Sequence, residues 1–349
     1  MPTIIAEVRF KRPGTNSWLF GAHSAPRSNS SKSDQIIIGT KRVKVTGDRS
    51  SAPLIAIDAI DPTLTKQLVK ALCLYYLHHS TPYQIDRILV ERISPLSKKT
   101  IFNVGSAPQG LKQPISKLAN LNLLSPLDFT KAAELLDESD RGRAKLNSVT
   151  HLFASISATN DYDSFLELWK AFNAIYKVYA GATKDFDCHR YVCNEVRTHP
   201  NKFASSCAGV SLLTKSDLFE IALLWNKMLQ TNYPTQNKAV ALHDSIIRNK
   251  DHRVLQAYSE KLAVRRDFLI NAGKLNPVTA HIAHHTTAQT IHDADIVCLL
   301  CVKYAYFYRN LLMHAEQAHH NMRFHEPSAP VEKLIPHLRH LVIDLVNIA

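Results

Sequence analysis

Apolar side chains recur at helical spacing through most of the chain after Pro126, and this pattern limits the fold more than any other feature. It is clearest between residues 163 and 180, where seven large apolar residues follow the i, i+3, i+4, i+7 rule and so share one face of a helix: Phe165, Leu168, Trp169, Phe172, Ile175, Tyr176 and Tyr179. Similar patterns predict further helices at 127–138, 143–158, 216–230, 238–248, 251–272, 290–318 and 331–348. The region is therefore predicted to be a mainly α helical bundle, with residues 182–210 irregular.

The first 125 residues have a different pattern of apolar residues, with short strand-like runs and several prolines. Ile4–Phe10 alternates as a strand does, and two short β-branched runs flank Gly39 like a hairpin, with residues 24–33 as a loop before them. Residues 63–93 predict two helices separated by Pro82, and the proline-rich stretch 94–128 predicts a linker. We expect a small β-containing module at 1–125 and a helical domain at 126–349.

Positive charge dominates the composition. The chain has 42 Lys and Arg against 30 Asp and Glu, a formal net charge of +12, which favours a polyanionic partner such as nucleic acid. Residues 1–50 hold nine basic and three acidic residues, and so contribute +6 of that total. A solvated basic face is the plainer alternative, but we favour RNA contact through the basic residues Lys11, Arg12, Lys41, Arg42 and Lys44.

Cysteine usage and hydropathy indicate a cytoplasmic protein. Six cysteines in 349 residues do not make a disulfide framework, and the N-terminus lacks the order of a signal peptide. We find no apolar run that we expect to span a membrane. Cys188, Cys193 and Cys207 lie near His189 and His199, but their spacing matches no common zinc pattern, so we expect free thiols and neither metal nor cofactor.

A short polar motif interrupts the apolar helix near the C-terminus. In Tyr304-Ala-Tyr-Phe-Tyr-Arg-Asn-Leu-Leu-Met-His314, an arginine, an amide and a histidine fall within six residues. Arginine pairs well with phosphate oxygens, and histidine exchanges a proton near neutral pH. On a regular helix Tyr306, Asn310 and His314 share a stripe, whereas Arg309 lies about 140° round from His314 and about 7.5 Å back along the axis. This geometry fits a site that a second subunit completes.

The order of these segments resembles the HEPN superfamily, most closely its Apea-like branch. The resemblance covers about residues 140–349: a helix at 143–158, an Asn-Asp turn, a Phe-x-x-x-Trp-x-x-Phe-Asn-x-x-Tyr helix, and far downstream Arg309-Asn310-x-x-x-His314. It implies an α-helical, usually dimeric domain, here with a helical region inserted at about 182–285. Many such domains are metal-independent ribonucleases with an Arg-x(4–6)-His motif.

The resemblance also implies roles for individual residues. His314 would act as acid or base, Arg309 would hold the phosphate, and Asn310 would orient the histidine or donate to a phosphate oxygen. Asn173 occupies a position that is frequently acidic in the family, and Tyr306 supports the site. The residues themselves, and not the resemblance, suggest that His319, His320 and Arg323 extend a basic edge beside His314 that would help to grip the RNA backbone.

We therefore expect an endoribonuclease that cleaves RNA through its 2′-hydroxyl, in the manner of a bacterial anti-phage or toxin effector. Its expected partners are RNA, a second copy of the chain, and an antitoxin or activator protein. Two alternatives remain open: a non-catalytic HEPN protein that binds RNA or nucleotide or serves dimerisation, and a DNA-binding regulator built on the basic N-terminus and residues 63–93.

Overall fold

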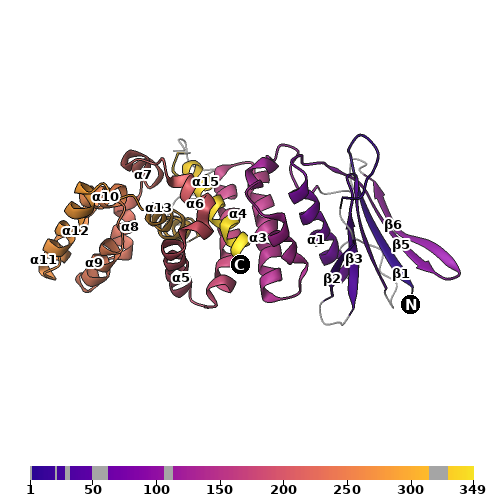
Figure 1. Ribbon diagram of the computed structural model, residues 1–349, viewed down its shortest axis with the longest axis horizontal. Coiled ribbons are helices and arrows are strands. Elements are labelled where there is room, and N and C mark those ends of the chain that lie inside the picture. The colour runs from indigo at the N-terminus through magenta and orange to yellow at the C-terminus, as the bar shows by residue number, and fades with distance from the viewer. Residues whose placement is uncertain (1, 20–21, 28–31, 49–61, 106–112, 314–328) are drawn as a thin grey trace. The chain divides into compact units, whose positions relative to one another are not determined.

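The computed structural model describes residues 2–19, 22–27, 32–48, 62–105, 113–313 and 329–349 (Figure 1). The chain divides into two compact units. The first comprises residues 1–159, 173–179 and 346–349, and the second comprises 160–172 and 180–345. The predicted division between residues 125 and 126 falls inside the first unit. The chain is mostly helical, as expected from its periodicity, with a sheet near the N-terminus.

The first unit is built on a six-stranded antiparallel sheet with the order β2-β3-β4-β1-β5-β6. Its strands are β1 (Thr3–Phe10), β2 (His23–Pro26), β3 (Ser33–Ile38), β4 (Arg42–Asp48), β5 (Ile85–Ser94) and β6 (Ser97–Gly105). The predicted strand at Ile4–Phe10 and the predicted hairpin around Gly39 are both confirmed, with Ile37 opposite Lys44. The sheet is larger than the sequence indicated, because three of its strands were not predicted.

The predicted helix at 83–93 is wrong, because this segment is β5. Ile85, Ile88 and Leu89 fit helical spacing, yet β5 pairs with β1 along its whole length, with Ile88 opposite Val8. The predicted linker at 94–128 is likewise wrong over Ser97–Gly105, which forms a hairpin with β5 as β6. Part of the predicted loop at 24–33 is also strand, since β2 pairs with β3.

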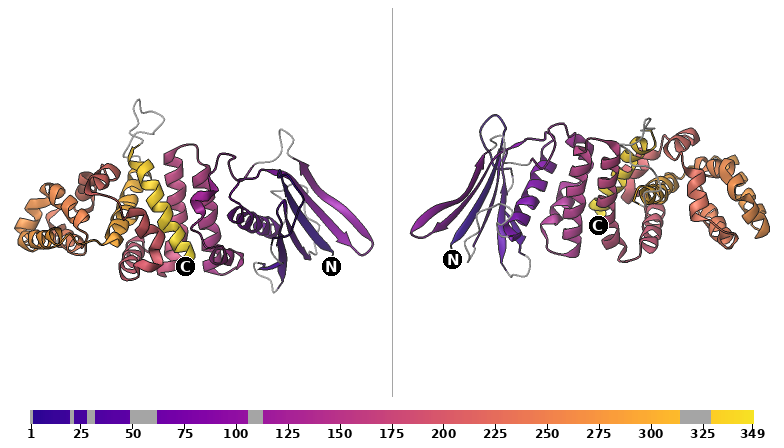
Figure 2. Two further views of the ribbon diagram at one scale, coloured as in Figure 1. Left: turned by 45° about the horizontal axis from the view of Figure 1, so that its top comes forward. Right: turned by 180° about the vertical axis from the view of Figure 1, so that it is seen from behind.

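Helix α1 (Pro62–His78) covers one face of the sheet (Figure 2). Alternate residues of β1 and β4 point into this core: Ile4, Ala6, Val8, Val43 and Val45 are buried. On α1, Leu64, Leu68 and Ala71 are buried as well, and the Gln67 Nε2 donates to the carbonyl of Pro26 at 2.8 Å. The confirmed helix therefore closes one side of the sheet, and the other side carries charged residues together with the half-buried Ile5, Ile37 and Leu89.

Lysines on α1 also bind the polar segment that follows α2 (Phe129–Ala132). Lys70 Nζ is fully buried and lies 2.7 Å from Glu138 Oε1, and it donates to the carbonyl of Leu136 at 2.7 Å. Lys66 Nζ contacts the other carboxylate oxygen of Glu138 at 2.6 Å. Glu138 directly precedes the capping residue Ser139 of α3 (Asp140–Ser157), so the ion pairs join two helices of the first unit.

Helix α4 (Asp161–Ala180) has the buried stripe that the sequence predicted. Phe165, Phe172 and Tyr176 are fully buried, and Gly181, with φ +61°, ends the helix as expected. Its start lies earlier than predicted: Asn160 Oδ1 accepts from the Asp163 amide at 2.9 Å. The helix belongs to both units, with residues 161–172 in the second and 173–179 in the first.

The helices that follow α4 make up the second unit. They are α5 (Asp185–Thr198), α6 (Ala204–Val210), α7 (Lys215–Ile221), α8 (Trp225–Asn232), α9 (Ala239–Ile247), α10 (His252–Lys261), α11 (Arg266–Asn271), α12 (Leu275–Thr287), α13 (Asp293–Val297), α14 (Ala305–Met313) and α15 (Ala329–Ile348). The prediction that residues 182–210 are irregular is wrong, because α5 and α6 fill most of this range. In α5 the buried stripe consists of Cys188, Val192, Cys193 and Val196.

Helix α13 runs through a π-helical segment, η7 (Cys298–Tyr304), into α14. This apolar stretch, Asp293–Met313, is long and apolar enough to cross a membrane by length and composition, contrary to our expectation that no such run exists. However, 67% of the apolar window is buried inside the protein, as in the core helix of a soluble protein.

The pH dependence of stability should show the burial of His79 in the first unit. The Arg12 guanidinium lies 3.2 Å from His79 Nδ1, an arrangement that suits a neutral ring accepting a hydrogen bond. Burial, and then the charge of Arg12, lower the pKa of His79 to about 4. As pH falls from about 6.5 to about 4, His79 becomes protonated in the unfolded chain but stays neutral in the folded protein. The free energy of unfolding therefore falls over this range.

We predict that His79→Gln reduces this acid-induced loss by roughly 2–3 kcal/mol in the free energy of unfolding. Urea denaturation followed at pH 7 and pH 4.5 measures the difference between the variant and the unaltered protein. His284→Gln, at an exposed histidine of α12, is the control and should change the pH dependence much less than His79→Gln does. An identical pH profile for His79→Gln would contradict the assignment.

Candidate functional site

The solvent-facing side of α14 carries the predicted motif. Phe307, Tyr308 and Leu311 are buried in the second unit, and Tyr308 packs edge-on against Phe165 of α4 at 5.6 Å between ring centroids. The half-buried residues Tyr306, Arg309 and Asn310 lie on the opposite side, at i, i+3 and i+4. We call these three residues the motif face.

Arg309 and Asn310 contact each other on this face. Arg309 Nη1 donates to Asn310 Oδ1 at 2.9 Å, which leaves the amide NH₂ of Asn310 and the other N–H groups of Arg309 for further bonds. Among the residues that the structure describes, no carboxylate lies within ion-pair distance of Arg309. The guanidinium is thus oriented by an amide and retains its positive charge for an anion.

Several predicted site residues are not described by the structure. His314, His319, His320 and Arg323 lie outside the described residues, so their predicted roles remain predictions. Asn173 is exposed on α4. Its predicted position facing the motif also remains a prediction, as does the composite site between two subunits.

Tyr306 connects the motif face to a pocket of about 570 Å³ in the second unit. Its ring contacts those of His189 and Trp169, at 4.8 and 5.8 Å between centroids. The pocket lies between α5, the end of α8, α9 and the π-helical segment η7, with Val302 and Lys303 of η7 in its lining. Asn310 lies one helical turn, about 6 Å, along the axis from Tyr306. We call this cavity the basic pocket.

Basic side chains outnumber acidic ones around the basic pocket. Of the described side chains, only one carboxylate, that of Asp244, lines it. The five cationic residues in its lining are Arg190, Arg197, Lys238, Arg248 and Lys303. Asp244 lies 2.9 Å from His243, and Arg197 is paired with Asp295 at 2.7 Å. In the described part of the chain no carboxylate is ion-paired with Lys238, Arg248 or Lys303, and Lys303 Nζ donates to Ser245 Oγ at 2.9 Å. The pocket therefore has an excess of positive charge.

The electrostatics of Cys193 agree with this excess. Its thiol is buried at the pocket wall and interacts with Cys298 of η7. The hydrogen bond with Cys298 lowers the pKa of Cys193 most, and the charges of Arg197 and Lys303 lower it further, against the effect of burial. None of the six cysteines forms a disulfide bond, and no group of three or more potential metal ligands occurs among the residues described.

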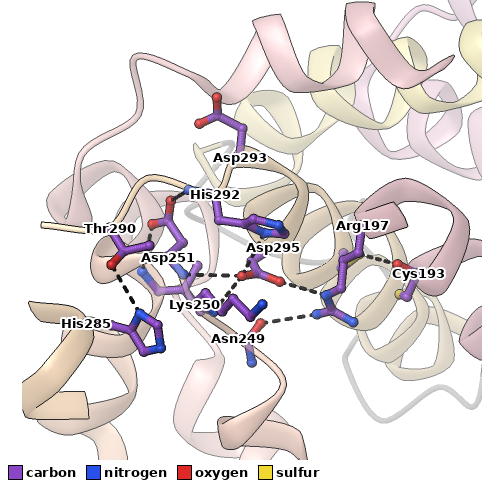
Figure 3. A network of polar contacts seen from close by, with 12 residues as sticks. Cys193, Arg197, Asn249, Lys250, Asp251, His285, Thr290, His292, Asp293 and Asp295 are labelled. Carbon is purple, nitrogen blue, oxygen red and sulfur yellow. Dashed lines mark hydrogen bonds and ion pairs between the residues drawn. The ribbon is translucent and has the colours of Figure 1, made fainter. Parts of the chain in front are cut away.

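A buried carboxylate network holds α13, the beginning of the continuous helix Asp293–Met313 that carries the motif and is called the motif helix (Figure 3). Asp295 of α13 accepts from Arg197 Nε of α5 at 2.7 Å and from the backbone amides of Lys250 and Asp251 at 2.6 and 3.2 Å. His292 Nδ1 lies 3.0 Å from the same carboxylate. Burial raises the pKa of Asp295, but His292, Arg197 and the backbone bonds outweigh it and hold that pKa below its usual value.

A second ion pair extends the network. Asp251 caps α10 by accepting from the Arg253 amide at 2.9 Å, and the Arg253 guanidinium contacts both Asp251 and Asp293, at 2.8 and 2.6 Å. Sequence reasoning missed these residues, since only Asp251, placed just before a predicted helix, gives a local capping signal. Apart from His292, which lies three residues earlier, the partners of Asp295 are separated from it by tens of residues and leave no local pattern.

The basic residues predicted in the first unit fall into two groups. Arg12 is held within the fold, where it donates to the carbonyl of Thr40 at 3.1 Å and lies over the ring of Tyr83, and Lys41 Nζ donates to the carbonyl of Gly14. These two are therefore engaged in structural contacts, while Lys11 is exposed. Arg42 and Lys44 lie on the face of the sheet opposite α1.

On that face the register places three arginines side by side. Arg9 of β1 lies opposite Arg42 of β4 and opposite Arg87 of β5, so the three form a row across the sheet. Glu7 pairs with Arg9 at 2.5 Å and with Arg42 at 3.3 Å, whereas Arg87 is exposed and has no carboxylate partner among the described residues. We call Arg9, Arg42 and Arg87 the arginine row.

An exposed aromatic residue adjoins the arginine row. The Arg42 guanidinium lies over the Trp18 ring, 4.7 Å from its centroid, and Trp18 is 45% exposed. Like charges directly opposite each other destabilise a sheet, and Glu7 offsets only part of this repulsion. A basic surface with an exposed indole is suited to the backbone and bases of a single-stranded nucleic acid.

Comparisons of the chain with protein families, with curated proteins and with solved structures found no match. The class of the protein therefore rests on the site itself, and membership of the HEPN superfamily remains a prediction from the sequence.

Asp295→Asn should lower the free energy of unfolding by about 3–5 kcal/mol, because it removes the buried carboxylate and leaves the half-buried Arg197 without its counter-charge. Chemical denaturation of the full-length protein measures the change. Asp187→Asn is the matched control: its carboxylate forms an exposed pair with Arg190 at 3.4 Å, and its loss should cost under about 1 kcal/mol. Similar small losses for both variants would show that the network does not stabilise the unit.

Proposed function

We propose that the protein is a metal-independent endoribonuclease that uses the 2′-hydroxyl of its RNA substrate as the nucleophile. The observation that carries this proposal is the motif face: Arg309, oriented by Asn310 and lacking a carboxylate partner in the described chain, lies one helical turn from a cationic pocket. A guanidinium in this state suits a phosphodiester oxygen, because it forms charge-assisted, bidentate bonds with phosphate.

In the proposed reaction, a base removes the 2′-hydroxyl proton and the 2′-oxygen attacks the adjacent phosphorus. The bond from phosphorus to the 5′-oxygen breaks, and an acid protonates that oxygen, leaving a 2′,3′-cyclic phosphate and a 5′-hydroxyl. His314 is proposed as acid or base because its side chain exchanges protons near neutral pH. Arg309 would stabilise the charge that develops on the phosphoryl oxygens. Because DNA lacks the nucleophile, the proposal requires RNA.

The arginine row supports RNA as the partner. It adds an exposed cationic surface on a second unit of the same chain, and an indole lies beside it. An alternative, a DNA-binding regulator built on the basic N-terminus and residues 63–93, loses the second helix of its expected pair, because residues 85–94 form β5. The other alternative, a non-catalytic protein that binds RNA or nucleotide, keeps the same binding surfaces and differs only in lacking cleavage.

Cleavage should depend on the motif and not on divalent metal. We predict that the purified protein cuts a mixed RNA pool in EDTA and leaves 2′,3′-cyclic phosphate ends, and that His314→Ala lowers the rate by at least about 100-fold. Arg309→Lys, which keeps the charge but loses the bidentate fork, should also slow cleavage markedly. Gel analysis of the products and their end groups measures both effects.

The control for this experiment is His284→Ala, which removes an exposed histidine of α12 and should cut as the unaltered protein does. Equal cutting by His314→Ala and the unaltered protein would refute the site. Binding of RNA without cleavage by any of these proteins would favour the non-catalytic alternative.

RNA binding should depend on the arginine row. We predict that Arg9→Gln with Arg87→Gln weakens binding of a 2′-O-methyl RNA, which cannot be cleaved by this mechanism. The slope of log K against log salt should flatten by roughly 0.7 for each arginine that contacts a phosphate. Fluorescence anisotropy between 50 and 200 mM salt measures both. Lys117→Gln, an exposed residue of the first unit outside the sheet, is the control; an unchanged slope in the double variant would contradict RNA contact at this face.

A further inference from the structure

The basic pocket has the size and lining of a site for a small anionic ligand. Its volume of about 570 Å³ falls within the roughly 300–1,000 Å³ common for small-molecule sites. It is lined from several elements: α5 on one side, α8 and α9 on the other, and η7 between them. Such convergence of distant segments distinguishes a cavity from a solvated face of one helix.

A bound anion explains the cations around the basic pocket better than a role in stabilising the fold does. Lys303 is the clearest case, because it interrupts the apolar run Cys-Leu-Leu-Cys-Val-Lys-Tyr of η7 and contacts the buried Ser245. Arg248 and Lys238 are exposed at the α9 side of the pocket. Three cations around one cavity, none ion-paired with a described carboxylate, repel one another, and a bound phosphate would relieve that repulsion.

Aromatic side chains also line the basic pocket, beside its cations. Tyr306 and Tyr233 are half-buried in the pocket lining, and the exposed Phe186 lies under the Arg190 guanidinium at 5.8 Å. Planar rings beside cations suit a ligand that joins a heteroaromatic base to a phosphate, since bases stack on aromatic side chains and phosphates pair with lysine and arginine.

The geometry points to a nucleoside monophosphate as the ligand of the basic pocket, with its phosphate near Lys303 and Arg248 and its base against the aromatic side chains. The same chemical group occurs as a free nucleotide and as the 5′-phosphorylated end of an RNA chain. This binding does not depend on the proposed ribonuclease activity. If both hold, Tyr306 links the nucleotide site to the motif face on the next turn of α14.

The test is calorimetric titration of the full-length protein with AMP, GMP, CMP and UMP, and with the corresponding nucleosides as controls without phosphate. A second arm uses a 2′-O-methyl tetranucleotide with either a 5′-phosphate or a 5′-hydroxyl. Because neither ligand class can be cleaved by 2′-hydroxyl attack, the result is independent of catalysis, and loss of cleavage would leave it unaffected. Binding of free monophosphates assigns a site for a small nucleotide, and binding of only the 5′-phosphorylated tetranucleotide assigns a site for an RNA end.

Lys303→Met and Arg248→Ala should each raise Kd about tenfold or more, because each removes a charge-assisted bond to the phosphate. Arg266→Ala, at an exposed arginine of α11 outside the pocket, is the matched control and should bind as the unaltered protein does. Thermal unfolding confirms that each variant is folded, and Lys238→Ala at the exposed rim replaces Lys303→Met if that variant does not fold. Absence of binding by any phosphorylated probe, or equal binding by the folded pocket variants and the control, overturns the proposal.

Discussion

The second unit depends on satisfying one buried carboxylate, that of Asp295. Moving an ionised carboxylate out of water is costly unless cations and N–H donors replace the lost hydration. Here the Arg197 guanidinium, the His292 ring and two backbone amides supply that replacement. Since these donors come from α5, the turn before α10 and the start of α13, the requirements of one side chain fix where three segments of the chain meet.

The same constraint positions the basic pocket. Arg197 is part of the pocket lining. It also donates to Asn249 Oδ1 at 3.3 Å, and Asn249 lies just after the end of α9. Asn249 in turn donates to the carbonyl of Ser245 at 2.6 Å, and the Ser245 hydroxyl receives a hydrogen bond from Lys303. A continuous chain of hydrogen bonds therefore runs from Asp295 to the lysine of η7. The network that stabilises the buried Asp295 carboxylate therefore also fixes the positions of Arg197 and Lys303 at the pocket.

Sequence periodicity predicted the correct element where a segment buries a wide stripe of large side chains. Helix α4 shows this, because Phe165, Trp169, Phe172 and Tyr176 repeat at helical spacing and an αL glycine follows. It failed for β5, where isoleucines at 85 and 88 fit a helix and a strand equally well and pairing with β1 decides between them. It failed again for α5, whose buried stripe is narrow and contains two cysteines that drew attention as possible metal ligands.

The candidate site was accessible to sequence reasoning only in part. Helical geometry alone indicated that Tyr306 and Asn310 share a stripe of one helix, but it set Arg309 apart from His314, and the contact between Arg309 and Asn310 appears only in the structure. The basic pocket and the arginine row have no such local signal, because their members come from segments up to about a hundred residues apart and are joined by packing and strand register. Arg87 illustrates the point, since its significance appears only when β5 is recognised as a strand beside β1.

The π-helical segment η7 makes the phase of the motif helix adjustable. A backbone hydrogen bond that closes one residue later than in an α-helix accommodates an additional residue without breaking the helix. If all seven residues of Cys298–Tyr304 formed a regular α-helix instead, everything beyond them would turn by about 100° relative to α13, the rotation of one residue. Arg309 and Asn310 would then leave the side of the helix on which Lys303 and Tyr306 meet the pocket. The π-helical segment therefore keeps the motif face in phase with α13 despite an additional residue, and losing one residue there would restore α geometry without turning the motif face away from the pocket.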